Sequence, residues 1–579
     1  MILKVPVLRD FFFYIHPTFT RMMDNYAIAD QFALLARLMD IHGDNPFKAK
    51  SYAAAAFAIE KLPVQLSETP PEKIASFKGI GDSAAKKIIE LLNTGQLAAL
   101  NELIFKTPPG ILEMMQIKGL GPKKIATIWK EMGLESLGEL LYACDENRLL
   151  MYKGFGEKTQ ESVKQSIHFF FQNKGNFLFA EIEPYALKVE KILRDKFPDY
   201  PSSLAGEISR QSNIITHVQV MTAIPKEILT PFLQAQHFEL FNTDHTISAT
   251  GAEGIKLNFI LSTKETFVSR HFASTCSESF LQAFTDATGF TTDQQFAGEA
   301  ELFSHFNMST VPVNQRELPI FIQKAKENKL SPAIQVEDIK GIIHSHSNWS
   351  DGLHTLEVMA KACIEKGYEY LVISDHSRSA FYANGLSVDR IREQHTLIDE
   401  LNTKLAPFRI FKSIECDILN DGSLDYEDAV LNSFDLVITS IHSNLKMTEE
   451  KAMQRLLKAI QHPSTTILGH MTGRLLLSRP GYPVDHKMLI DACTDHQVVI
   501  EINAHPRRLD IDWSWIPYAM EKGCLLSVNP DAHQVEGFED VRYGVISAQK
   551  GGLTASHNLS SFSRTELESF LQKQSAKRG

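Results

Sequence analysis

The sequence predicts a multidomain protein that combines α+β and α/β architecture. A chain of 579 residues with 44% apolar content is too long for one hydrophobic core. Residues 26–170 carry apolar positions at helical spacing, most clearly over 27–39 and 51–62. From residue 338 onward, short apolar runs alternate with helical segments, which is typical of a parallel barrel or sheet built from βα units.

A five-residue unit recurs three times in the helical part, at residues 77–81, 117–121 and 152–156. Each unit reads apolar, Lys, Gly, apolar, Gly and precedes a lysine-bearing helix. The glycines let backbone N–H groups approach a DNA phosphate, and the helix N-terminus that follows adds a favourable partial charge. This is the logic of the helix-hairpin-helix motif, with ordinary tight turns as the alternative. The predicted DNA-binding residues are Gly79, Gly81, Lys87, Gly119, Gly121, Lys123, Lys124, Gly154 and Gly156.

Composition favours a cytoplasmic protein without a membrane partner, which we expect to be a monomer. The six cysteines lie far apart with no C-x-x-C pair, which suits a reducing compartment. No window reaches the length and apolarity of a membrane span. The net charge is −11, and residues 43–175 hold 17 Lys and Arg against 15 Asp and Glu. DNA affinity must therefore come from placed groups, because bulk charge gives little attraction.

Histidines and carboxylates follow the apolar runs of the last third of the chain. The carboxyl ends of strands in a parallel barrel converge on one face, so these side chains should share one pocket. Clustered carboxylates repel one another and buried imidazoles need partners, so we expect two or three divalent cations there: Mn or Zn, with Fe as a further option. Such cations activate water and stabilise a leaving alkoxide, which predicts hydrolysis of a phosphoester. The predicted ligands are His344, His346, Asp351, His376, Glu415, His442, His470, Asp531 and His533.

Four motifs resemble the PHP (polymerase and histidinol phosphatase) domain. They lie at residues 343–352, 374–377, 469–474 and 531–533. From about residue 23, the chain is similar to bacterial family X DNA polymerases with a C-terminal PHP domain. The resemblance implies a distorted (β/α)7 barrel that holds three metals and acts as a 3′–5′ exonuclease, with abasic-site or 3′-phosphatase activity as further options. It makes Arg474 a candidate catalytic contact to phosphate, and Arg508 either a second contact or a surface ion pair.

The same resemblance implies a polymerase-beta-like small domain, fingers and a nucleotidyltransferase-like palm. Lys87 matches the family's Schiff-base lysine for removing a 5′-deoxyribose phosphate, although Ser83 replaces a neighbouring lysine and a plain phosphate contact is the alternative. His217, Gln219 and Lys256 stand where the palm should carry three metal-binding aspartates. Two-metal nucleotidyl transfer needs those charges, so we expect a degenerate polymerase site.

The expected domains are an N-terminal extension (1–22), a small helical domain (23–106), fingers (107–175), a degenerate palm and thumb (176–317), a linker (318–337) and a PHP domain (338–579). The leading hypothesis is a metal-dependent 3′–5′ exonuclease that acts on gapped, nicked or 3′ DNA ends in repair. A working family X polymerase with an attached exonuclease is the first alternative. A non-catalytic DNA-end-binding scaffold and a small-phosphate phosphatase are the others.

Overall fold

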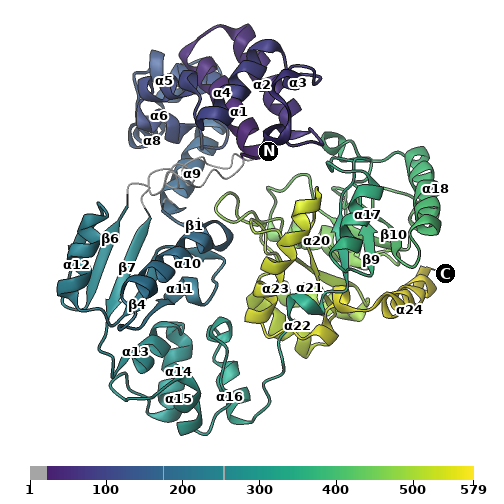
Figure 1. Cartoon of the computed structure of the whole chain (residues 1–579). Helices are drawn as coiled ribbons and strands as arrows, with labels where there is room; N and C mark the ends of the chain where they lie inside the picture. The colour runs from purple at the N-terminus through teal and green to yellow at the C-terminus, as the bar shows by residue number, and fades with distance from the viewer. Residues whose placement is uncertain (1–22, 174, 252–254, 579) are drawn as a thin grey trace. The chain divides into compact units, whose positions relative to one another are not determined.

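The computed structural model describes residues 23–173, 175–251 and 255–578 (Figure 1). The predicted extension at residues 1–22 lies outside these ranges. The chain divides into two compact units, Met1–Lys174 and Gly175–Gly579. Within the described ranges, no helix has the length and apolarity to cross a bilayer.

The first unit is helical, as predicted. Helix α1 begins after Asp24, whose carboxylate accepts a hydrogen bond from the Ala27 N–H, and it ends at Gly43 in the left-handed conformation (φ 77°). Its Phe32 ring packs edge-on against Tyr52 of α2, with 5.8 Å between ring centroids. The helices are α1 (Asn25–His42), α2 (Pro46–Glu60), α3 (Pro71–Ile74), α4 (Asp82–Thr94), α5 (Ala98–Lys106), α6 (Pro109–Met114), α7 (Pro122–Ala126), α8 (Leu137–Asp145) and α9 (Glu157–Asn173).

The second unit begins with a five-stranded mixed sheet in the order β2-β4-β7-β6-β5. Strands β4 and β7 run parallel, and the other neighbouring strands run antiparallel. Helix α10 contacts β2, α11 contacts both β2 and β4, and α12 contacts β5. This mixed sheet matches the predicted palm. The elements are α10 (Phe179–Lys196), β2 (Ser202–Ala205), α11 (Gly206–Ser209), β4 (Val218–Thr222), α12 (Lys226–Ala235), β5 (Glu239–Asn242), β6 (Thr246–Thr250) and β7 (Lys256–Leu261).

A cluster of four helices follows the sheet: α13 (Phe267–Ser274), α14 (Glu278–Thr288), α15 (Glu299–His305) and α16 (Ile320–Lys326). Phenylalanine side chains from these helices form its core. Helix α16 lies inside the segment 318–337 that the sequence suggested as a linker. Its Phe321 and Ile322 are buried in this core, so that part of the segment packs against the preceding helices.

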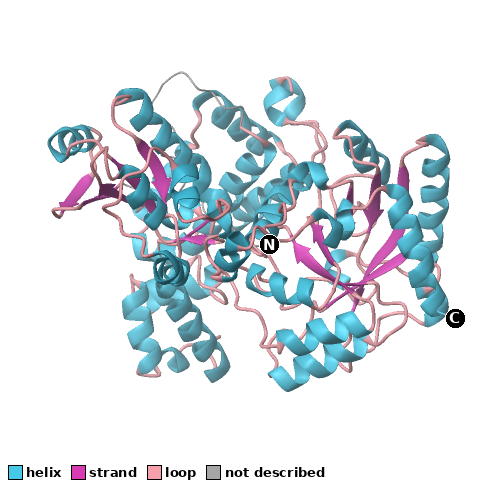
Figure 2. Cartoon of the chain, turned by 90° about the horizontal axis from the view of Figure 1, so that it is seen from below, coloured by secondary structure: helices cyan, strands magenta, loops and turns pink. Residues whose placement is uncertain are grey.

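Seven parallel strands in the order β14 to β8 form the last part of the chain (Figure 2). Nearly every strand residue is buried, because helices cover the outer face of the sheet. A parallel bridge between Ser345 and Ala532 joins the first strand to the segment after the last and nearly closes a barrel, as predicted. The strands are β8 (Gly341–Ser345), β9 (Tyr370–Ile373), β10 (Arg409–Asp417), β11 (Leu436–Ser440), β12 (Ile467–Leu468), β13 (Val499–Asn503) and β14 (Leu526–Asn529).

Charged contacts join the barrel to the rest of the second unit. The fully buried Lys550, at the end of α23 (Val541–Lys550), donates to the Arg210 carbonyl (2.8 Å) and to Oε1 of Glu317 (2.9 Å). Burial lowers the pKa of Lys550 to about 8, although Glu317 opposes the shift. Arg507 pairs with Glu181 of α10 at 2.9 Å. The palm-like sheet and its helices are thus tied to the barrel.

Candidate metal centre and DNA-binding turns

The structure brings the nine predicted ligands together at the carboxyl end of the barrel. His344 and Glu415 lie within β8 and β10, and the others lie in segments that follow strands. Eight of the nine form three groups whose ligand atoms lie within 4.8 Å of one another. The ninth, His470, donates from Nε2 to Glu415 at 2.9 Å if that nitrogen is protonated. The groups are His346, Asp351, His376 and His533; His344, His346 and Asp531; and His376, Glu415 and His442.

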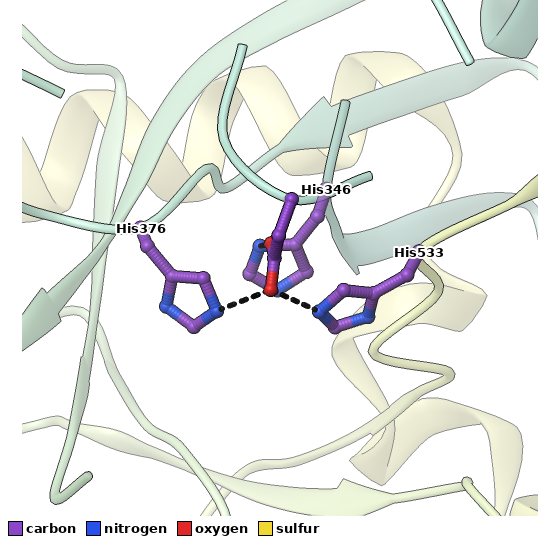
Figure 3. A group of neighbouring side chains, drawn as sticks. His346, His376 and His533 are labelled. Carbon is purple, nitrogen blue, oxygen red and sulfur yellow. Dashed lines mark ion pairs between the residues drawn. The ribbon is translucent and has the colours of Figure 1, made fainter. Parts of the chain in front are cut away.

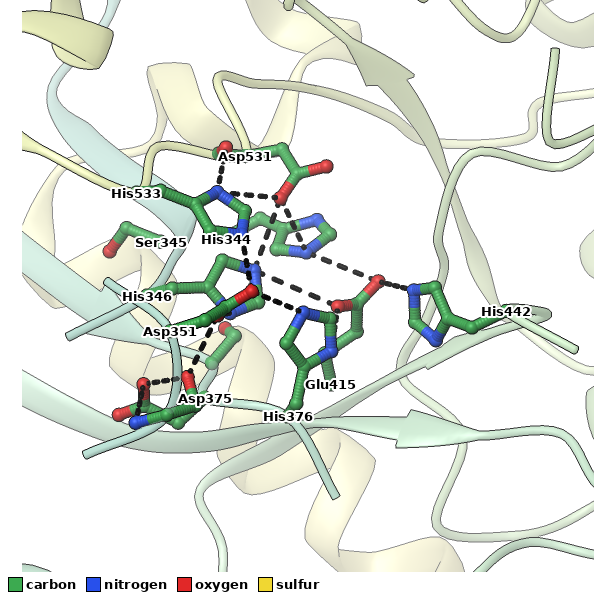
Figure 4. Close-up of polar contacts among 12 residues, drawn as sticks. His344, Ser345, His346, Asp351, Asp375, His376, Glu415, His442, Asp531 and His533 are labelled. Atoms are coloured by element: carbon green, nitrogen blue, oxygen red, sulfur yellow. Dashed lines mark hydrogen bonds and ion pairs between the residues drawn. The ribbon is translucent and has the colours of Figure 1, made fainter. Parts of the chain in front are cut away.

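Glu415 is the centre of the cluster (Figure 4). Its Oε2 lies 3.0 Å from Nδ1 of His376, and its Oε1 lies 3.1 Å from Nε2 of His442. Burial alone would raise the pKa of Glu415, but the surrounding imidazoles His442, His344 and His376 hold it well below its usual range. A buried carboxylate therefore stays ionised among five histidines.

Asp351 is the more exposed counterpart of Glu415. Its Oδ2 lies 3.7 Å from Nε2 of His376 and 3.5 Å from Nε2 of His533. Figure 3 shows these two imidazoles together with that of His346. The Asp351 and His533 side chains are 32% and 41% exposed, whereas His346 behind them is fully buried. This edge is therefore where a substrate can reach the ligands.

Buried ligand atoms without a hydrogen bond are the places where divalent cations would fit in this cluster. Five ligand atoms are buried without a hydrogen bond among the described residues, and two of them, His376 Nδ1 and Glu415 Oε2, face each other at 3.0 Å. Each such atom costs free energy unless another group binds it. Imidazole nitrogens and carboxylate oxygens without thiolates suit Zn or Mn. The atoms are His344 Nε2, His346 Nδ1, His376 Nδ1, Glu415 Oε2 and His470 Nδ1.

A second layer of side chains, which the sequence analysis missed, holds the ligands in place. Nδ1 of His344 lies 2.5 Å from Oε1 of the fully buried Glu501 on β13, whose Oε2 accepts from the His470 backbone N–H at 2.8 Å. Nδ1 of His442 lies 2.5 Å from Oδ1 of Asp417 on β10. Such partners fix the tautomer and the orientation of a ligating imidazole. The sequence did hold a signal for these supporting residues, namely a charged residue inside an apolar strand run. Buried charges are rare without a partner, so each such residue indicates a nearby partner.

The two arginine candidates differ in position. Arg474 directs its donors at Asp512 Oδ2 (2.9 Å) and at the carbonyls of Arg508 (2.9 Å) and Leu509. It therefore holds the loop that carries Arg508, and its catalytic role stays a prediction. Nε of Arg508 lies 3.6 Å from Oδ2 of the predicted ligand Asp531, and its side chain is 21% exposed. Arg508 is the arginine that lies beside the ligands.

The three glycine units form the same turn. The first glycine of each, Gly79, Gly119 and Gly154, has a φ of 92°, 91° and 95°, which only glycine adopts readily. Gly81 and Gly121 then cap α4 and α7 with no side-chain hydrogen bond to the free N–H groups of the first turn. Beyond the glycine itself and its two chain neighbours, no atom of the described residues lies within 4 Å of a Cβ built at either capping glycine. Both turns leave the backbone open to a phosphate.

Lysines follow these turns. Lys87 is half-buried in α4, and Lys124 donates to the Gly119 carbonyl at 3.2 Å. Lys123 and Lys124 both lie in the single turn α7. These positions accord with phosphate contacts, and the lyase role of Lys87 stays a prediction.

The residues at the expected polymerase site also meet in space. Register between β4 and β7 pairs Val218 with Leu257, which places His217 next to Lys256 at the start of both strands. The Gln219 side chain fills the space beside Gly206. A Cβ added to Gly206 would lie 1.6 Å from Oε1 of Gln219. An amide, an imidazole and an ammonium thus occupy the three positions where the sequence analysis expects metal-binding aspartates, and the loss of polymerase activity stays a prediction.

Together, the barrel with its imidazole and carboxylate cluster, the palm-like sheet and the repeated hairpin turns define a PHP-type, metal-dependent phosphoesterase joined to a DNA-binding, polymerase-like region. Family models support the helical part. A "Helix-hairpin-helix domain" matches residues 23–97, and a "SAM-like Helix-hairpin-helix tandem" matches residues 111–168.

Curated relatives extend the comparison to the whole chain. The "DNA polymerase/3′-5′ exonuclease PolX" of Bacillus subtilis (strain 168) is 31% identical over 564 residues, which cover 93% of this chain and 98% of that protein. The chain belongs to this PolX family of family X DNA polymerase/3′–5′ exonucleases. A probable phosphatase of Vibrio atlanticus (strain LGP32) is 25% identical over 34% of this chain and 79% of its own length. The probable phosphatase YcdX of Escherichia coli O81 (strain ED1a) is 31% identical over 16% of this chain and 37% of its own length.

Proposed function

We propose that this PolX relative is a 3′–5′ exonuclease that shortens gapped, nicked or single-stranded DNA ends during repair, and that its palm no longer polymerises. The single observation that supports the nuclease most strongly is the meeting of nine ligand-type side chains, five of which carry a buried atom without a hydrogen bond. The predicted ligands would hold two or three divalent cations, Mn or Zn. These cations, when bound, supply activation of water and stabilisation of charge on the phosphoryl oxygens.

The side chains themselves set how a substrate enters. The exposed edge at Asp351 and His533 admits the terminal phosphate, while Glu415 and His344 stay buried behind it. Arg508 lies on the ligand Asp531 with a fifth of its side chain exposed, so its guanidinium can also reach a phosphate oxygen. The Arg508 guanidinium offsets part of the charge of the DNA backbone, and bound cations would add to this effect, in a chain whose net charge is −11.

Specific observations bear on two alternative functions, a working polymerase and a non-catalytic scaffold. Family membership favours a working polymerase, but His217 and Lys256 side by side give no anionic field for Mg²⁺, which demands oxygen ligands. A non-catalytic scaffold that binds DNA ends is opposed by the intact ligand cluster.

The six cysteines are free and buried, in keeping with our proposal of a cytoplasmic protein. We further propose that it is a monomer.

The nuclease is tested with a 5′-labelled oligonucleotide and Mn²⁺. We expect a ladder of shortened products from the unaltered protein and none from Glu415→Gln or from His344→Ala combined with His346→Ala. The matched control is His462→Ala, because His462 pairs with Asp428 on the surface and belongs to no ligand group. Equal shortening by the Glu415 variant would place the nuclease site elsewhere.

A further inference from the structure

Two large aromatic side chains stand in solvent beside the candidate metal centre. Phe381 and Tyr382, in the short helix η8 (Phe381–Ala383), are 88% and 72% exposed. The Tyr382 ring lies 6.1 Å from the ring of the predicted ligand His376, between centroids. Leaving two adjacent aromatic rings in water forgoes much of the free energy that their burial would give. Their exposure is therefore unexplained by the packing of the chain.

The backbone under these two rings is held firmly. Ala380 and Ala383, which flank them, are 0% and 1% exposed. Ser379 donates its hydroxyl to Asp417 (2.8 Å) and its backbone N–H to Asp425 (2.7 Å). The segment thus buries its small residues and presents its large ones.

The anchor of this segment is shared with the metal centre. Asp417 accepts from Ser379 through Oδ2, and its Oδ1 lies 2.5 Å from Nδ1 of the predicted ligand His442. One carboxylate therefore positions both an imidazole of the cluster and the loop with the exposed rings. A ligand held by the cluster would lie within reach of Tyr382 at a fixed distance.

We propose that Phe381 and Tyr382 form a stacking subsite for the nucleobases next to the scissile phosphodiester. The inference rests on the proposed nuclease function, because that function brings a DNA 3′ end to His376. Phosphates are bound by the cations and Arg508, whereas an uncharged, flat base needs an apolar face of its own size. Aromatic rings provide one that accepts any base, since every base has a π-face. The subsite thus binds the last bases of the strand without reading their sequence.

The kinetic test compares two 5′-labelled oligonucleotides that differ only in the last nucleotide, which carries a base in one and an abasic tetrahydrofuran in the other. Combining Phe381→Ala with Tyr382→Ala should raise KM for the base-bearing end by roughly 5- to 150-fold, the range that aromatic truncation gives at such sites. The KM for the abasic end and kcat for both should change little. Met488→Ala, which removes a 50% exposed apolar side chain from α21 (His486–Asp495) of the barrel, is the control and should change neither KM.

A binding test separates this subsite from the nuclease itself. A 3′-terminal 2-aminopurine, placed behind an uncleavable phosphorothioate, should lose fluorescence on binding the unaltered protein and Met488→Ala, and keep it with the double variant. Equal quenching with the double variant, or an equal rise in KM for the base-bearing and the abasic end, would overturn the stacking subsite. The exposed rings would then be a surface for binding another protein. If the unaltered protein cleaves no diester, the nuclease proposal fails, and the quenching result still decides the subsite.

Discussion

Nδ1 of His344 lies 2.5 Å from Oε1 of Glu501, and both side chains are fully buried. Burial would lower the pKa of His344, but Glu501, followed by Asp531 and Glu415, raises it well above its usual range. The contact also directs Nε2 of His344 at Asp531, 3.5 Å away. Glu501 thus orients a predicted ligand without belonging to any ligand group itself.

The Glu501 contact predicts a loss of metal affinity on mild substitution. Glu501→Gln keeps the shape of the side chain but weakens its hold on the imidazole, so Mn²⁺ affinity should fall by about 10- to 100-fold. Isothermal titration of the metal-free protein measures this change. Glu400→Gln, on the exposed face of α18 (Val388–Lys404), should leave the affinity unchanged. Equal affinities for both variants would show that Glu501 only packs.

The hairpin turns predict a specific loss of DNA binding. Gly119→Val introduces a side chain where φ is 91°, and Gly121→Val blocks the open approach to the first turn of α7. Together they should weaken binding by about 1–3 kcal/mol, the range for lost hydrogen bonds to charged groups. Fluorescence anisotropy at physiological salt measures the affinity. Gly133→Val is the control, because Gly133 also has a positive φ (66°) but lies outside the three hairpin turns. This variant should bind DNA as tightly as the unaltered protein. An equal loss of DNA affinity in this variant would mean that backbone strain alone explains the weaker binding.

The palm should not extend primers. His217, Gln219 and Lys256 supply neither the carboxylates nor the charge that two Mg²⁺ ions need. With the nuclease silenced by His344→Ala and His346→Ala, a primer–template with all four nucleotides should give no longer product on a sequencing gel.

Template-dependent addition in this assay would refute the degenerate palm. If extension is absent, aspartate at positions 217, 219 and 256 is the further test. Aspartate at position 219 has a shorter side chain than Gln219 and would free the space beside Gly206. The next residue, Glu207, would stay unchanged in this variant.

Much of this architecture could be predicted because its signals are local. Apolar periodicity predicted the helical region and the barrel strands, and the histidines stand out because they follow those strands directly. The supporting layer was missed for the opposite reason: Glu501 and Asp417 lie within strands, where only tertiary contacts explain a buried charge. Arg474 shows the same limit, since sequence gives its neighbours along the chain but not that its donors point at the 508–512 loop. The domain boundaries remain predictions.

Lys550 predicts a rise in stability at alkaline pH. Its pKa is about 8 in the folded chain and 10.5 in the unfolded one, so the unfolded chain binds more protons between these values. The free energy of unfolding should therefore increase between pH 8 and pH 10.5, by at most ~3 kcal/mol, relative to Lys550→Met. Urea unfolding at a series of pH values, followed by tryptophan fluorescence, measures the difference. Trp513 is a suitable probe because its ring centroid lies 4.9 Å from Nζ of Lys550. A difference between the two proteins that does not vary with pH would mean that Lys550 stays protonated in the folded chain.

Strand β10 pairs with β9 over residues 409–412 and with β11 over residues 413–417, and both Glu415 and Asp417 lie in its second half. Because side chains alternate along a strand, a slip of one residue against β11 would aim Cys416 at the centre and turn both carboxylates away. Such a barrel could still bury apolar surface, yet five histidines would lose their common acceptor. Metal uptake would therefore report on the register of a refolded chain: a barrel with β10 slipped by one residue could be compact and yet bind no cation, and a metal column would separate it from the native form.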